Sequence, residues 1–304
     1  MSPTSSSPAR CSSRGGRADV RRTWPGTCWG SPWPTPGGTR HPVGWADRVG
    51  DVLSPTGRGR YGGAVSTDTP GPVAALPEVR HALRTATHDL LGDTIQVSDD
   101  DWGGPSGLPG WTRAELAAHI ARHADAVRGV IEGALRGEDV PLYPTPEARE
   151  SAIRAGAGRD GLAIQEDLDA SSSALEDTFD RIHDWTMPVL FRGTRVPVAA
   201  LALGRLAEVA IHHIDLAIGA GFGDLDPDVA VLVLGWAVER IGSKPDAPAL
   251  RLVAPDGREW TTPAVDDAGP TQVSADPAQL LGWLAGRLPA DAVSGADGVV
   301  VPSW

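Results

Sequence analysis

The chain has 304 residues and a net charge of −12 at pH 7, enough length for one large domain or two modest ones. This acidic balance argues against nucleic acid and against anionic membrane surfaces as partners. No stretch approaches the roughly 18 consecutive apolar residues of a membrane span, so we expect a cytoplasmic protein.

The first 64 residues differ sharply in composition from the rest. They carry nine arginines and three aspartates, a net of +6, which leaves −18 on the other 240 residues. They hold 12 glycines and 8 prolines but only four Leu, Ile, Val or Phe residues, too few to offset the entropy of ordering the segment. We therefore predict a disordered low-complexity tail over residues 1–71. A mis-assigned start, with translation beginning at Val65, is the alternative that the sequence leaves open.

Both cysteines, Cys11 and Cys28, lie in this tail. The remaining chain therefore has neither a disulfide nor a thiol nucleophile of its own. Any thiol chemistry there must use a thiol brought in from outside.

From residue 72 the apolar spacing becomes helical. It predicts helices over residues 74–93, 112–136, 147–184 and 198–218, with an extended segment at 185–197. Thr112 and Glu115 form a capping box at the start of the second helix. Four such helices joined by loops indicate a bundle over residues 72–222.

The pattern changes after residue 223. It predicts a helix that opens at Asp226-Pro227 and runs to about Ile241, and a last helix over 276–287. Short strands are predicted over residues 250–253, 259–262, 271–274 and 298–301. These elements indicate a small α/β domain over residues 223–304.

The helix over residues 198–218 is apolar nearly all round, which is typical of a buried helix. At about 100° per residue, its polar side chains share an arc of about 80°; they are Arg205, Glu208, His212 and Asp215. Glu208 and His212 lie one turn apart and could hold a borderline metal such as zinc. A buried ionic cluster, with Arg205 paired to Glu208 and His212 to Asp215, is the alternative.

A third candidate ligand, His119, lies on the core-facing side of the second predicted helix. His123, one turn further on, is the second choice. An ordinary core histidine is the alternative for either position. On the fourth helix His213 points away from the polar arc. The other helical histidines are interpreted as surface or packing residues: His81, His88 and His183.

Three segments resemble the mycothiol-dependent maleylpyruvate isomerase family. They are residues 108–119 (LPGWTRAELAAH), 204–216 (GRLAEVAIHHIDL) and 280–287 (LLGWLAGR), with a closing Trp304. The resemblance covers residues 72–304. It implies a DinB-like four-helix bundle followed by a small α/β domain.

The resemblance also implies a divalent metal held by His119, Glu208 and His212, with zinc favoured by these ligands. Three protein ligands leave a position for a small-molecule thiol, mycothiol or a similar compound. The metal would lower the pKa of that thiol. In an isomerase the thiolate would add to a double bond of the substrate, and its expulsion after rotation would give the other geometric isomer.

By the same resemblance Arg287 would hold a substrate carboxylate, although a surface arginine at a helix end is the plain alternative. Arg205 is expected to orient Glu208, with Asp215 in a similar supporting role. The predicted function is thus a thiol-dependent isomerase or S-transferase acting on a small electrophile, as a monomer or weak homo-oligomer. A non-catalytic metal-binding regulatory module and a metal-dependent hydrolase, with Asp215 or His123 as its base, are the alternatives.

Overall fold

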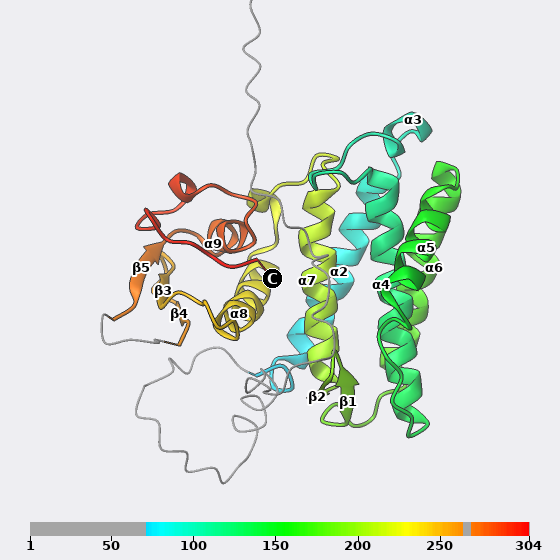
Figure 1. Ribbon diagram of the computed structural model, residues 1–304, viewed down its shortest axis with the longest axis horizontal. Helices are drawn as coiled ribbons and strands as arrows, with labels where there is room; N and C mark the ends of the chain where they lie inside the picture. The colour runs from blue at the N-terminus through cyan, green and yellow to red at the C-terminus, as the bar shows by residue number, and fades with distance from the viewer. Residues whose placement is uncertain (1–70, 264–268, 304) are drawn as a thin grey trace, which may run out of the picture.

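The structure is a computed structural model that describes residues 71–263 and 269–303. The predicted tail, except Gly71, lies outside the described residues, and so do Cys11, Cys28 and Trp304. The described part is mostly helical, with two small sheets (Figure 1). None of its helices is both long and apolar enough to cross a membrane.

The first part of the fold is a group of helices that lie side by side in Figure 1. Within it α4 packs on α5 and α6, and α2 packs on α7. A short hairpin of β1 (Pro188–Phe191) and β2 (Thr194–Pro197) precedes α7. The helices are α2 (Leu76–Thr94), α3 (Asp99–Trp102), α4 (Arg113–Leu135), α5 (Pro146–Ala157), α6 (Gly161–Asp180) and α7 (Ala199–Asp215).

The second part contains α8 (Pro227–Gly242), α9 (Pro277–Leu284) and a three-stranded sheet. The sheet has the order β4-β3-β5, from β3 (Leu250–Val253), β4 (Glu259–Thr261) and β5 (Thr271–Ser274). β3 is antiparallel to β4 and parallel to β5. Short 3-10 turns lie at Phe222–Asp224 and Ala290–Ala292. α8 packs on both α7 and α9, so it joins the two parts.

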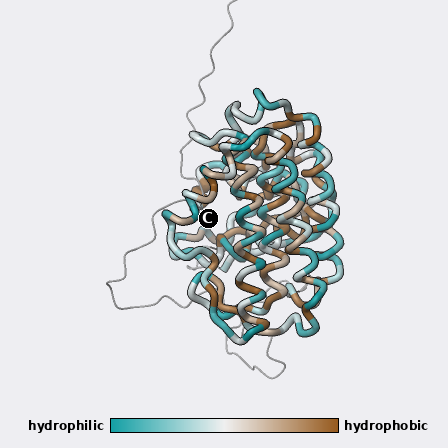
Figure 2. The backbone as a smooth tube through the Cα atoms, turned by 90° about the vertical axis from the view of Figure 1, so that its right-hand side faces the viewer, coloured by the Kyte–Doolittle hydropathy of each residue, from teal (hydrophilic) through white to brown (hydrophobic). Residues whose placement is uncertain are grey.

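The apolar residues that predicted the helices form one continuous core through both parts. Apolar and polar segments alternate along the helices in Figure 2, as expected of helices that bury one face. Leu116, Ile120, Leu168 and Leu206 are fully buried at the centre of the helical part. The helix α7 buries nearly its whole circumference, as its composition predicted.

Two predicted elements were wrong. The helix predicted over residues 147–184 is two helices, because Gly158 ends α5 and the Asp160 side chain accepts from the Ala163 amide to start α6. The strand predicted over residues 298–301 is irregular, since Gly298 adopts a φ of 75° and Val300 is 81% exposed with no strand beside it. A run of valines therefore gave a strand pattern without a partner.

Candidate metal centre

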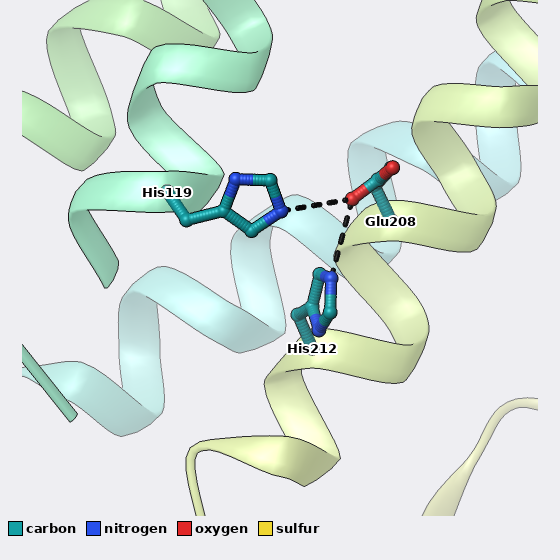
Figure 3. A group of neighbouring side chains, drawn as sticks. All are labelled: His119, Glu208 and His212. Carbon is teal, nitrogen blue, oxygen red and sulfur yellow. Dashed lines mark ion pairs between the residues drawn. The ribbon is translucent and has the colours of Figure 1, made fainter. Parts of the chain in front are cut away.

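Three buried side chains from two helices converge on one point (Figure 3). His119 comes from α4, and Glu208 and His212 come from α7, one turn apart. The Glu208 Oε2 atom lies 3.5 Å from His119 Nε2 and 3.3 Å from His212 Nε2. One ligand atom from each residue lies within 4.8 Å of the other two, so this trio could hold a metal ion.

The trio fits a divalent metal. His119 Nε2 and Glu208 Oε2 are buried and make no hydrogen bond. Buried polar atoms without a partner cost free energy, which a bound metal ion would offset. Zinc binds nitrogen and oxygen ligands at about 2.0–2.2 Å, which separates tetrahedral ligands by roughly 3.3 Å. The distances of 3.3 and 3.5 Å from Glu208 Oε2 to the two histidine Nε2 atoms match that spacing.

The protonation of two of these groups suits metal binding. Burial lowers the pKa of His119 to about 4, so its imidazole is neutral at pH 7. Burial by itself would raise the pKa of Glu208. The neighbouring imidazoles of His123, His119 and His212 outweigh burial and hold that pKa well below its usual value. Glu208 is therefore an ionised carboxylate facing a neutral imidazole.

His212 is oriented by a carboxylate behind it. Its Nδ1 lies 2.9 Å from Asp215 Oδ2, and Asp215 is only 3% exposed. Burial would lower the pKa of His212, but the hydrogen bond to Asp215 and the neighbouring Glu208 carboxylate raise it to about 9. A carboxylate on one ring nitrogen directs the other nitrogen to the metal in many histidine sites. The pairing of His212 with Asp215 is one of the two contacts that the ionic-cluster alternative expected.

Arg287 completes this arrangement from the second part of the fold. Its Nε donates to Asp215 Oδ1 at 3.0 Å and its Nη2 to Asp215 Oδ2 at 2.8 Å. Its Nη1 donates to the Ala285 carbonyl. Arg287 therefore reaches toward the site as expected, but the carboxylate that it holds in the structure belongs to Asp215.

Arg205 differs from its predicted role. It is 1% exposed, and its Nη1 donates to the Ile120 carbonyl of α4 at 2.8 Å. Among the described residues it forms no ion pair with Glu208, so it does not orient that carboxylate by direct contact. Burial lowers the pKa of Arg205 to about 10, which still leaves it charged at pH 7. Its contact fixes α4 against α7.

His123 lies beside the trio but outside it. Its Nε2 is 3.4 Å from Glu208 Oε1, the oxygen that faces away from His119 and His212 in the ion pairs. Burial lowers its pKa to about 3. Among the other described histidines, His213 pairs with Asp93 at 2.9 Å. His81, His88 and His183 are exposed, in agreement with their interpretation as surface residues.

The ends of α4 and α7 are tied together near the site. Arg113, the first residue of α4, donates from Nε to the Leu216 carbonyl and from Nη2 to the Ala217 carbonyl. The Gly107 amide donates to the Asp215 carbonyl at 2.6 Å, and a Cβ on Gly107 would lie 3.1 Å from that oxygen. These contacts set His119 opposite His212.

Sequence reasoning missed two side chains at the site. Arg149 of α5 places its Nη2 3.3 Å from His119 Nδ1. The ring of Tyr143 lies against the Arg149 guanidinium, and its hydroxyl is buried without a hydrogen bond. Burial, with Glu208 nearby, raises the pKa of Tyr143 to about 12. No periodic signal marks either residue, because both reach the site through the packing of α5 and its preceding loop on α4.

The chain is similar to known proteins over the helices that carry the trio. Residues 83–217 match the family model described as the mycothiol maleylpyruvate isomerase N-terminal domain. No curated protein matches the chain by sequence. A crystal structure of the mycothiol-dependent maleylpyruvate isomerase is 28% identical, with a TM-score of 0.67, and the match covers 80% of this chain and 100% of that one.

A structure of a histidine-to-alanine mutant of the mycothiol-dependent maleylpyruvate isomerase also matches. It is 27% identical, with the same TM-score of 0.67 and the same coverage of 80% and 100%. The sequence match spans α4 and α7, the helices that carry the trio. The structural matches extend over most of the described residues. Together these comparisons support the family resemblance, by sequence over residues 83–217 and by structure over most of the described residues.

Proposed function

We propose that this protein is a metal-dependent enzyme that uses a small-molecule thiol, mycothiol or a similar compound, to isomerise or S-conjugate a small electrophile. The observation that carries the proposal is the convergence of His119, Glu208 and His212 on one buried point. Similarity to solved structures that are named as mycothiol-dependent maleylpyruvate isomerases supports it.

In this proposal His119, Glu208 and His212 hold a divalent metal, with zinc favoured by two nitrogens and one oxygen. When bound, such a metal lowers the pKa of a thiol that reaches its open position. The described part of the chain after residue 70 contains no cysteine. A thiol supplied as a cofactor is consistent with that composition.

The chain's own residues orient the site and the substrate. Asp215 holds the Nδ1 side of His212, so that the Nε2 of His212 faces Glu208. Arg287 uses three N–H groups on Asp215 and Ala285 and has two more to offer. We assign those two to a substrate carboxylate. Arg205 acts as a positioning residue through the Ile120 carbonyl.

The proposal extends to the architecture. The packing of α2, α4, α6 and α7 supports a DinB-like four-helix bundle over residues 72–222. The β3–β5 sheet with α8 and α9 supports a separate α/β domain over residues 223–304. A disordered tail over residues 1–71, a cytoplasmic location and a monomeric or weakly associated state complete the proposal.

The test is turnover by the zinc-loaded full chain with maleylpyruvate, in the presence and absence of mycothiol. Isomerisation is followed by ultraviolet absorbance, and conjugation by mass spectrometry of the thiol. We expect turnover that requires the thiol and falls at least about 100-fold in His119→Ala. Thiol-independent hydrolysis would instead identify a hydrolase. Binding of zinc without turnover of any electrophile offered would leave a metal-binding module.

A further inference from the structure

A second feature beside Glu208 is a cavity of about 160 Å³ between the two parts of the fold. Its walls come from α4, the β1–β2 hairpin, α7 and α8. His123 and Glu208 lie at its inner wall, and Phe191, Arg192, Trp236 and Arg240 lie on the hairpin and α8 sides. A cavity of about 150 Å³ can hold benzene, so this one suits a small organic molecule.

Two guanidinium groups that line this cavity form no ion pair with a carboxylate of the described residues. Arg240 lies over the Trp236 ring at 5.5 Å, and its Nε is buried with no hydrogen bond. Arg192 lies over the Phe191 ring, also at 5.5 Å. Among the described residues neither arginine forms an ion pair. Stacking on the two rings holds both guanidinium planes in place and leaves their N–H groups for a ligand.

The charges around the cavity point to an anion. Burial lowers the pKa of Arg240 to about 10, and the positive charge of Arg192 adds to that effect. Burial and the charges of Arg240 and Arg192 also lower the pKa of Lys244, the only lysine in the chain. Three cations thus lie close together in a protein of net charge −12. Glu208 and Asp246 offset part of this positive charge, and a bound anion would offset more of it.

The backbone also places Arg192 in an unusual conformation. Arg192 has a φ of 50° and Gly193 a φ of 84°, as in the two-residue turn of a tight hairpin. Asn, Asp and Gly normally occupy the first position of such a turn, and a longer side chain there is uncommon. Arg192 therefore has a disfavoured backbone conformation at a position where the residue lines the cavity.

We propose that Arg192 and Arg240 form a subsite for the carboxylate of a small organic acid, which occupies the cavity with its other end beside Glu208. This inference rests on the proposed function, because it assigns the substrate class of the same site. The arginines would attract the anion, whereas the Glu208 carboxylate, which also lines the cavity, would repel it. Guanidinium groups bind carboxylate with paired hydrogen bonds. The subsite is distinct from Arg287, which holds Asp215 on the other side of His212.

The test is binding of maleate, a small dicarboxylate, to the full chain by isothermal titration calorimetry, with and without zinc. We compare Arg192→Gln and Arg240→Gln with the matched control Arg258→Gln, whose guanidinium pairs with Asp256 between β3 and β4. Each cavity variant should weaken maleate binding by about tenfold or more in both metal states. The control should stay within about twofold of wild type. Arg192 is exposed, so its variant keeps the test valid if Arg240→Gln fails to fold.

Three results would overturn the subsite. The first is an unchanged affinity for maleate in both cavity variants. The second is maleate binding that requires zinc and is unaffected by either arginine substitution. Inorganic phosphate binding as tightly as maleate would remove the assignment to a carboxylate. Because the titration contains no thiol, its outcome is separate from the turnover assay. Arginine-dependent binding without turnover counts against the proposed function alone, and turnover with arginine-independent binding counts against the subsite alone.

Discussion

Arg287 and Asp215 form a bidentate ion pair that joins the second part of the fold to the end of α7. The two contacts measure 3.0 and 2.8 Å, and Asp215 also accepts from His212 Nδ1 at 2.9 Å. Burial would raise the pKa of Asp215, but the hydrogen bonds from His212 and Arg287 lower it. The position of Arg287, which follows α9, therefore bears on the orientation of His212, a metal-ligand candidate 75 residues earlier in the chain.

Replacing Asp215 with Asn should weaken zinc binding by about 10–100-fold. The amide removes the negative charge that fixes the ring of His212 and strengthens its Nε2 as a ligand. Zinc affinity is measured by competition with a chromophoric chelator. Asp93→Asn is the matched control, since Asp93 pairs with His213 on the same helix but outside the trio. An equal loss of zinc affinity in Asp215→Asn and Asp93→Asn would mean that Asp215 acts only through the stability of α7.

His119→Ala should remove zinc from the protein. The purified wild-type chain should contain about one zinc per molecule, and the variant close to none, because two remaining ligands hold the ion poorly. Metal content is measured by mass spectrometry with inductively coupled plasma. His88→Ala, at an exposed position of α2, should keep the wild-type content. Full zinc occupancy in His119→Ala would remove this histidine from the site.

Thr112→Ala should lower the free energy of unfolding by about 1 kcal/mol. Thr112 accepts from the Glu115 amide, and Glu115 accepts from the Thr112 amide, so both halves of the capping box are present at the start of α4. Urea unfolding followed by circular dichroism measures the change. Glu115→Gln is the matched control, because the glutamine side chain can still accept from the Thr112 amide. It should lower the free energy of unfolding by less than Thr112→Ala does. An unchanged midpoint in Thr112→Ala would contradict the cap.

Ala217→Gly should stabilise the protein by up to about 1 kcal/mol. Ala217 follows α7 with a φ of 55°, a conformation that costs a residue with a Cβ about 1–2 kcal/mol. Glycine removes this cost, but its greater entropy in the unfolded chain offsets about 0.4–1 kcal/mol of the stabilisation. Thermal and urea unfolding measure the balance. Gly219→Ala, at a φ of 129°, is the opposite change nearby and should destabilise the chain. Lower stability of Ala217→Gly would mean that the left-handed backbone carries no strain.

Much of the local structure could be predicted from the sequence, because it depends on neighbours along the chain. The Thr112 capping box and the buried helix α7 were confirmed, and so were two of the strands at their full bounds, β3 and β5. The polar arc of Glu208, His212 and Asp215 followed from helical geometry alone, since residues three and four apart share a face. The break between α5 and α6 was missed because the apolar spacing continues across Gly158.

Only the tertiary structure decided which residues from different elements meet. Helical spacing placed His119 and His123 on the same face of α4, and their ranking came from a resemblance. Packing of α4 against α7 then brought His119 Nε2 to one Glu208 oxygen and His123 Nε2 to the other. The sequence likewise determined that Glu208 is buried and needs a partner. The contacts of Arg205, Arg287 and Arg149 depend on distances across the fold, which no spacing along the chain encodes.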